Sequence, residues 1–146
     1  MYSTILRPLN RWLGGVELSR RYSSHGETAT LVRFAGRRSE ISTAAVPADW
    51  RDYDRLLFDI YCDRKVISTV TLRIYDESEM QAGPKAARGY YEARDKIFIQ
   101  NGWNHAEVRL GTLRTASYDR DLNMDQVRGM SLLAGQAEFS LTLYLR

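Results

Sequence analysis

The alternation of apolar and polar residues with a period of two is the feature that most restricts the fold of this chain. It is clearest in residues 55–63 (RLLFDIYCD), where the even positions are all apolar. Successive side chains of a β-strand point to opposite faces, so this period is typical of a strand with one buried face. The residues predicted to face the core in this segment are Leu56, Phe58, Ile60 and Cys62.

The same period recurs in 27–34, 66–76, 104–110 and 139–146, and shorter strand candidates occupy 96–100 and 129–135. These segments are rich in β-branched and aromatic residues, which favour strands. Because no helices alternate with them, the strands predict an all-β fold, an antiparallel β-sandwich that forms a single domain over residues 1–146. The further positions predicted to face the core are Val66, Val70, Leu72, Ile74, Ala106, Val108 and Leu110.

Helical patterns are scarce. The best candidate is a short helical turn at 123–129 (NMDQVRG), which Asn123 or Asp125 would cap and Gly129 would end. Residues 77–95 show no strand pattern, and their glycines and proline predict a long loop.

Charge and cysteine content restrict the class of protein. The net charge is +3, and the 21 basic residues are scattered among 18 acidic ones, so no basic tract indicates a nucleic-acid partner. The single cysteine, Cys62, excludes an intrachain disulfide and is predicted to be a small core residue. No segment is apolar for long enough to predict a signal peptide or a membrane span. We expect either a cytoplasmic protein or a domain of a larger secreted protein, for which an extracellular or periplasmic location is favoured.

The order of four segments resembles the galactose-binding-like jelly-roll domains, which serve as carbohydrate-binding modules and as accessory domains of glycoside hydrolases. In 47–62 (PADWRDYDRLLFDIYC), a Trp-x-x-Tyr stretch leads into a strand that ends in Asp-x-Tyr. The segment 101–110 (NGWNHAEVRL) resembles the Gly-Trp-Asn start of a hairpin strand. The other two segments are 18–34 (LSRRYSSHGETATLVRF) and 121–135 (DLNMDQVRGMSLLAG), the latter followed by 139–146. The resemblance implies a jelly-roll β-sandwich in which Trp50 and Trp103 pack at the starts of strands, in the core or at a sheet edge.

The resemblance also implies a structural calcium ion, although no cofactor would be required for binding. Glu17 and backbone oxygens around Ser24 and Gly26 would hold this ion near the N-terminal turn. Members of the family usually continue the last strand with a calcium-binding aspartate, whereas this chain ends at Arg146.

Candidate ligand-binding residues follow from the chemistry of sugar recognition. Flat aromatic rings stack on the apolar face of a pyranose, and planar polar groups bind its hydroxyls. Arg73 and Tyr75 are predicted to lie on the outward face of one strand, with Tyr61 on the same face of a neighbouring strand. The residues that would complete the site are Arg109, of matching parity in its own strand, and Tyr90, Tyr91 and Arg94 in the long loop. The alternative is a solvated sheet face on which tyrosines cover apolar neighbours.

These features favour a non-catalytic carbohydrate-binding or accessory domain that recognises a polysaccharide and accompanies a neighbouring catalytic domain. The two histidines, His25 and His105, are expected in a turn and on the polar face of a strand. Their spacing matches neither a catalytic triad nor a metal-binding helix, so no enzyme is predicted. The main alternative is a structural or protein-interaction β-sandwich without a glycan ligand, and a free-standing glycan-active enzyme is a third.

Overall fold

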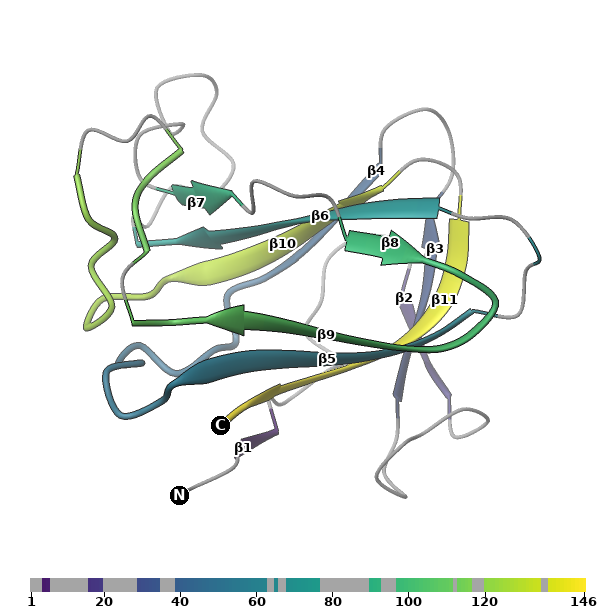
Figure 1. The fold of residues 1–146 in the computed structure, drawn as a ribbon, viewed down its shortest axis with the longest axis horizontal. Helices are drawn as coiled ribbons and strands as arrows, with labels where there is room; N and C mark the ends of the chain where they lie inside the picture. The colour runs from purple at the N-terminus through teal and green to yellow at the C-terminus, as the bar shows by residue number, and fades with distance from the viewer. Residues whose placement is uncertain are drawn as a thin grey trace.

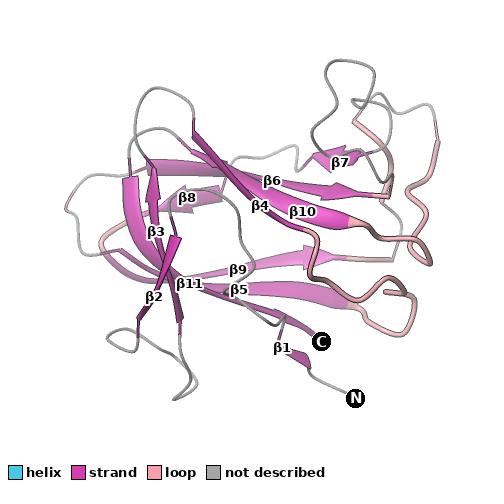
Figure 2. Ribbon diagram, turned by 180° about the vertical axis from the view of Figure 1, so that it is seen from behind, coloured by secondary structure: helices cyan, strands magenta, loops and turns pink. Residues whose placement is uncertain are grey.

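The fold consists of antiparallel strands in two layers (Figure 1). The structure is a computed structural model that describes residues 4–5, 16–19, 29–34, 39–62, 65, 68–76, 90–92, 97–111, 113–116, 120–134 and 137–146. Within these residues Figure 2 shows strands and loops, and no helix that could span a membrane is found there. The all-β antiparallel sandwich predicted from the sequence is confirmed.

One layer is a six-stranded sheet in the order β2-β3-β11-β5-β9, with β1 paired to β11. Its strands are β1 (Thr4–Ile5), β2 (Val16–Ser19), β3 (Ala29–Phe34), β5 (Arg55–Cys62), β9 (Gly102–Arg109) and β11 (Ala137–Leu145). The other layer is a five-stranded sheet in the order β4-β10-β6-β7, with β8 also paired to β6. Its strands are β4 (Ser39–Thr43), β6 (Ser68–Tyr75), β7 (Tyr90–Glu92), β8 (Ile97–Ile99) and β10 (Gly129–Ala134).

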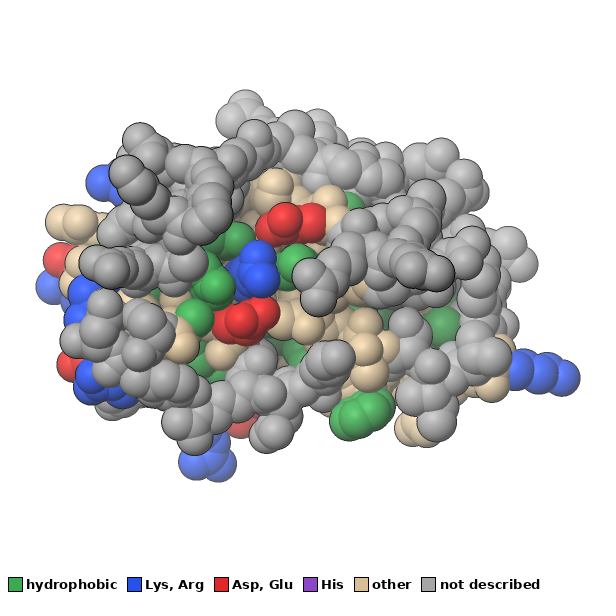
Figure 3. Space-filling model, turned by 90° about the horizontal axis from the view of Figure 1, so that it is seen from above, with side chains coloured by type: hydrophobic (Ala, Val, Ile, Leu, Met, Phe, Trp, Pro, Cys, Tyr) green, Lys and Arg blue, Asp and Glu red, His purple; other side chains and the backbone are tan. Residues whose placement is uncertain are grey.

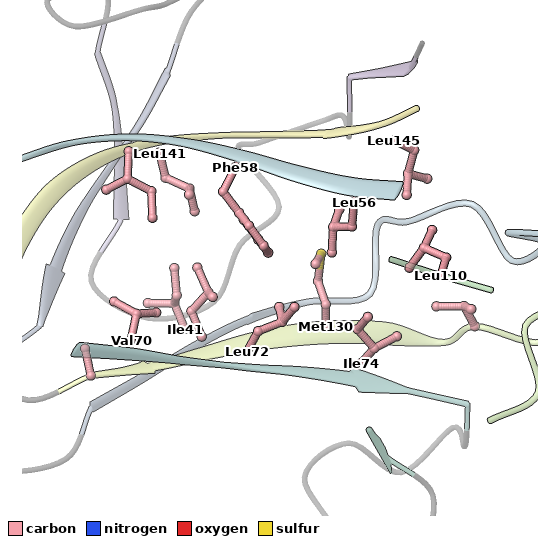
Figure 4. Close-up of a cluster of buried hydrophobic side chains, with 14 of the residues drawn as sticks. Ile41, Leu56, Phe58, Val70, Leu72, Ile74, Leu110, Met130, Leu141 and Leu145 are labelled. Carbon is pink, nitrogen blue, oxygen red and sulfur yellow. The ribbon is translucent and has the colours of Figure 1, made fainter. Parts of the chain in front are cut away.

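The core lies between the two sheets and includes the residues that the alternation predicts in β5 and β6 (Figure 4). Leu56, Phe58, Ile60 and Cys62 of β5 are at most 2% exposed, and Val70, Leu72 and Ile74 of β6 are fully buried opposite them. Each large apolar side chain buried in this way contributes roughly 1.5–3 kcal/mol of transfer free energy. In β9 the even positions are partly buried and the odd ones exposed, as predicted. Val66 lies outside the described residues.

The predicted helical turn at 123–129 is wrong, because the segment forms non-helical turns. Its backbone groups are bonded to distant parts of the chain. The carbonyl of Met124 accepts from the amide of Trp50 at 2.7 Å, and the amide of Val127 donates to the carbonyl of Ala48 at 2.7 Å. One local bond forms, from the amide of Gln126 to the carbonyl of Asn123 at 3.0 Å, and the long-range bonds take the place of the others that a helix would need.

The two tryptophans expected to pack at strand starts behave differently. Trp50 is fully buried, and its indole Nε1 donates to the Pro47 carbonyl at 2.6 Å, so that prediction is confirmed. Trp103 is 40% exposed at the start of the edge strand β9 and packs against the ring of Tyr61, so it lies at the sheet edge and not in the core. In the register of β5 and β9 it lies opposite Tyr61, on the side of the sheet that faces away from the core.

A buried ion pair fastens the end of β6 to the loop before β10. The carboxylate of Asp76 is fully buried and accepts from Arg120 at 2.5 and 2.9 Å. It also accepts from the backbone amide of Asn123 at 2.9 Å. A buried carboxylate needs such partners, so Arg120 holds this junction together.

Burial of Cys62 makes a testable prediction. Its side chain is 2% exposed in the core, so the thiol should not react with an aromatic disulfide reagent in the native protein. The reagent should label the single cysteine of each chain once a denaturant unfolds the fold. Rapid labelling without denaturant would contradict this placement of β5.

Candidate functional site

The outer surface of the five-stranded sheet gathers aromatic and charged side chains. Since Val70, Leu72 and Ile74 of β6 point to the core, Arg73 and Tyr75 lie on the opposite side of the sheet. The antiparallel register brings partners from the neighbouring strands to that side, namely Glu40, Ser131, Tyr90, Glu92 and Phe98. We call these residues, with Arg73 and Tyr75, the five-stranded face.

Arg73 is the centre of the five-stranded face. Its Nε lies 3.3 Å from Oε1 of Glu92, and its guanidinium carbon lies 4.9 Å from the ring centroid of Tyr90. The side chains of Arg73 and Glu92 are 26% and 34% exposed, so both polar groups can be reached from solvent. Figure 3 looks down on this face and shows a basic side chain between acidic ones, with aromatic or apolar side chains beside it. A guanidinium held by a carboxylate and an aromatic ring keeps a fixed orientation for hydrogen bonding.

The pKa of Arg73 is raised even though partial burial alone would lower it. The contact with the hydroxyl of Tyr75 and the charge of Glu92 outweigh the loss of hydration. The guanidinium therefore remains charged while it is partly withdrawn from water.

Tyr75 forms part of the floor of the five-stranded face. It is 4% exposed, and its hydroxyl lies 3.4 Å from Oε1 of Glu40 and 3.3 Å from Oγ of Ser131. Its ring is 5.6 Å from that of Tyr90 at 45°. The sequence predicts that Tyr75 contacts a ligand, and its burial shows that this prediction is wrong. The ring of Tyr75 instead supports the ring of Tyr90, which is the one available for stacking on a ligand.

Burial raises the pKa of Tyr75 above the ordinary 10.0. A phenol whose pKa is higher in the folded state favours folding fully below pH 10, and this contribution is lost as the pH rises through the folded-state pKa. We therefore expect Tyr75 to titrate above pH 10 and the thermal stability to fall there. Spectrophotometric titration of the wild type and of Tyr75→Phe checks this, because the variant should lack the absorbance change that Tyr75 contributes above pH 10. Superimposable titration curves would contradict it.

Phe98 is a second aromatic element that the sequence reasoning missed. It is 69% exposed on β8, opposite Thr69 of β6. Thr69 precedes Arg73 by four residues, a rise of about 13 Å along a strand. The five-stranded face thus presents the Tyr90 ring near one end of β6 and the Phe98 ring near the other, a spacing suited to an extended ligand. The alternation in 96–100 was visible in the sequence, but nothing there indicated which sheet the strand would join.

The structure brings together only some of the predicted ligand residues. Arg73 and Tyr90 share the five-stranded face, and Tyr90 and Tyr91 lie on strand β7 instead of in a loop. Tyr91 lies opposite Ile74 and packs against the core, so its expected place in the wall of a groove is wrong. In a three-residue strand only alternate side chains can share a face.

Tyr61 and Arg109 lie on the other sheet, so the expectation that Tyr61 shares a face with Arg73 is wrong. Tyr61 belongs to β5 and Arg109 to β9, both in the six-stranded sheet, whereas Arg73 belongs to the five-stranded sheet. Consecutive strands β5 and β6 join different layers, which sequence parity alone does not reveal. Arg94 lies outside the described residues.

The predicted calcium ligands are not covered by the described side chains. Ser24 and Gly26 lie outside the described residues, and Glu17 lies on β2 with only its backbone described. Among the residues that are described, no group of three or more His, Cys, Asp or Glu side chains is placed to hold a metal ion. The structural calcium ion stays a prediction.

The fold is an antiparallel β-sandwich whose outer sheet face carries aromatic and charged side chains. Comparison with solved structures shows which known domains share this fold. The chain is similar to a family 11 carbohydrate-binding module from Clostridium thermocellum in complex with a β-1,3-1,4-mixed-linked tetrasaccharide, at 15% identity over 98% of this chain and 94% of that one, with a TM-score of 0.69. A family 29 carbohydrate-binding module matches at 14% identity over 100% and 92% of the two chains, with a TM-score of 0.57. A family 22 xylan-binding domain matches at 14% identity over 99% and 91%, with a TM-score of 0.51.

The resemblance to jelly-roll domains of the carbohydrate-binding-module type is therefore confirmed at the level of the fold. No protein-family model and no curated protein sequence matches the chain.

Proposed function

We propose that this chain is a non-catalytic carbohydrate-binding domain that holds a polysaccharide on the five-stranded face. The observation that carries the proposal is the cluster of Arg73, Glu92 and Tyr90, in which a guanidinium, a carboxylate and an aromatic ring meet on a partly exposed sheet surface. Such a cluster offers hydrogen-bond donors and acceptors beside a stacking surface, the two elements that a pyranose ring requires.

An extended chain of sugars would lie along the five-stranded face between Tyr90 and Phe98. The exposed Phe98 ring would stack on one sugar, and Tyr90 would contact another. Arg73 would donate to hydroxyl oxygens, and Glu92 would accept from hydroxyl groups. No bond is made or broken in this mechanism, so the proposal assigns the domain no catalytic step.

A polysaccharide-binding domain of this kind would accompany a catalytic domain. One structure with a similar fold combines family 22 and GH10 modules of a xylanase from Clostridium thermocellum, in a complex with xylohexaose. We infer that this chain works outside the cell, where it would keep an enzyme close to a polymeric substrate.

Affinity electrophoresis tests the proposal. The chain should be retarded in native gels that contain mixed-linked β-1,3-1,4-glucan or xylan, the ligands named for two of the similar structures, relative to gels without polysaccharide. Retardation by one of these polymers would support the carbohydrate-binding function. Unchanged migration with both, and with a wider panel of polysaccharides, would favour an interaction domain without a glycan ligand.

A further inference from the structure

The outer surface of the six-stranded sheet carries a separate group of aromatic and polar side chains. Trp103 is 40% exposed on β9, and the ring of Tyr61 on β5 meets it edge-on at 5.3 Å and 70°. The ring planes of Trp103 and His105 are parallel within 4°, with centroids 6.4 Å apart. The outer surfaces of the two layers face opposite sides of the sandwich (Figures 1 and 2), so this group is distinct from the five-stranded face.

A buried carboxylate fixes the position of His105. The side chain of Asp59 is 5% exposed although it lies on the outer side of β5, and its Oδ1 is bonded to Nδ1 of His105, whose side chain is 72% exposed. Since Asp59 orients the ring, Nε2 of His105 is held in a fixed direction next to the indole of Trp103, where it can form a hydrogen bond with a ligand.

The exposed side chains follow one edge of the sheet in a straight row. The outward positions of β9 are Trp103, His105, Glu107 and Arg109, and β9 is the last strand in the order of the six-stranded sheet. The row extends about 20 Å from its first to its last residue at the rise of a β-strand. It begins with a flat aromatic surface and continues with polar groups, which suits a ligand that is itself extended and repetitive.

The charges of this row are balanced. Glu107 lies 3.3 Å from Arg55 and 3.8 Å from Arg109, and Asp59 adds a second negative charge to match the two arginines. Nucleic acids and anionic membranes require an excess of positive charge. The row therefore favours an uncharged polymer.

We propose that the row of Trp103, His105, Glu107 and Arg109, with Tyr61 and Asp59 behind it, is a second binding site for a neutral polysaccharide. The proposal rests on the carbohydrate-binding function assigned above and extends it. Because the two sites face opposite directions, one molecule would bind two polysaccharide chains and bridge them. Such bridging raises avidity where polysaccharide chains lie on both sides of the domain, without any new contact at either site.

Light scattering by mixtures of the protein with mixed-linked β-1,3-1,4-glucan tests the bridging. We expect scattering to rise with protein concentration, because each protein molecule joins two polysaccharide chains. It should fall again at excess protein, when each binding segment of the polysaccharide is occupied by a separate protein molecule. Trp103→Ala should abolish this rise, yet it should still be retarded by the glucan through the five-stranded face. Trp103→Phe, which keeps a stacking ring, should recover part of the scattering, and Arg51→Ala, an exposed substitution away from both sheets, should scatter like the wild type.

A second measurement isolates the site. In the double variant Arg73→Ala/Tyr90→Ala, the residual affinity for the glucan should fall by a further factor of about ten or more when Trp103→Ala is added. If Trp103→Ala changes neither scattering nor residual affinity while the wild type is retarded, the second site is refuted and the first stands. Self-association that occurs without glucan and that Trp103→Ala removes would also refute it, since the row would then be a protein interface. If no polysaccharide retards the wild type, both proposals fail.

Discussion

Replacing Arg120 with alanine is expected to lower the free energy of unfolding by about 3 kcal/mol, within the range found when one partner of a buried ion pair is removed. The carboxylate of Asp76 is fully buried and accepts two hydrogen bonds from Arg120. Without the guanidinium, only the backbone amide of Asn123 would remain as a described partner for that charge. The cost falls toward the lower end of the range because Arg120 is 34% exposed, which gives water a route to the vacated position.

Arg114→Ala is a matched control for this prediction. Arg114 also pairs with an aspartate, at 3.2 Å from Asp121, but the two side chains are 46% and 68% exposed. An exposed pair of this kind contributes about 1 kcal/mol or less. Urea denaturation of both variants gives the comparison, provided that the slope of each transition is unchanged. A loss for Arg120→Ala no larger than that for Arg114→Ala would show that Asp76 does not depend on its partner.

The strands with a clear alternation were predictable because their information is local, whereas β1, β4 and β7 carry no such pattern and were not predicted. The alternation in 55–63 identified Leu56, Phe58, Ile60 and Cys62 as core residues, and all four are buried. A residue's face in a strand follows from its parity and from the apolar neighbours that must be covered. The same reasoning placed His105, Glu107 and Arg109 on the outward side of their strand, and all three are exposed.

The arrangement of strands in sheets was not predictable in the same way, because it depends on contacts between distant segments. β5 and β6 are consecutive, yet β5 pairs with β9 and β11, and β6 pairs with β7, β8 and β10. Parity alone therefore grouped Tyr61 with Arg73, although they lie on opposite sides of the sandwich. The turn at 123–129 was not predictable for the same reason. Capping signals are local in the sequence, whereas the backbone bonds of this segment with Ala48 and Trp50 join distant parts of the chain.

Replacing Arg73 with alanine is expected to weaken binding of the retarding polysaccharide by about tenfold to a hundredfold, the loss typical of a central arginine or aromatic residue in a binding site. The substitution removes the guanidinium donors from the five-stranded face and leaves Glu92 without its ion pair at 3.3 Å. Tyr90→Ala should cause a loss of similar size, because it removes both the stacking ring and the surface on which the guanidinium rests. Isothermal titration calorimetry with an oligosaccharide of the polymer measures both losses directly.

The conservative variants separate charge from geometry in this site. Arg73→Lys keeps the positive charge but loses the planar fork of donors, so it should recover little of the lost affinity if bidentate hydrogen bonds to sugar hydroxyls are what Arg73 supplies. Glu92→Gln keeps the shape of the partner and removes its charge, so it should weaken binding less than Arg73→Ala does. Arg51→Ala, which alters only an exposed pair with Asp49, should bind like the wild type. Full affinity in Arg73→Ala, with its thermal stability preserved, would exclude the cluster of Arg73, Glu92 and Tyr90 as the binding site, because a glycan that contacts Tyr90 would lie beside the guanidinium, whose carbon is 4.9 Å from the centroid of that ring.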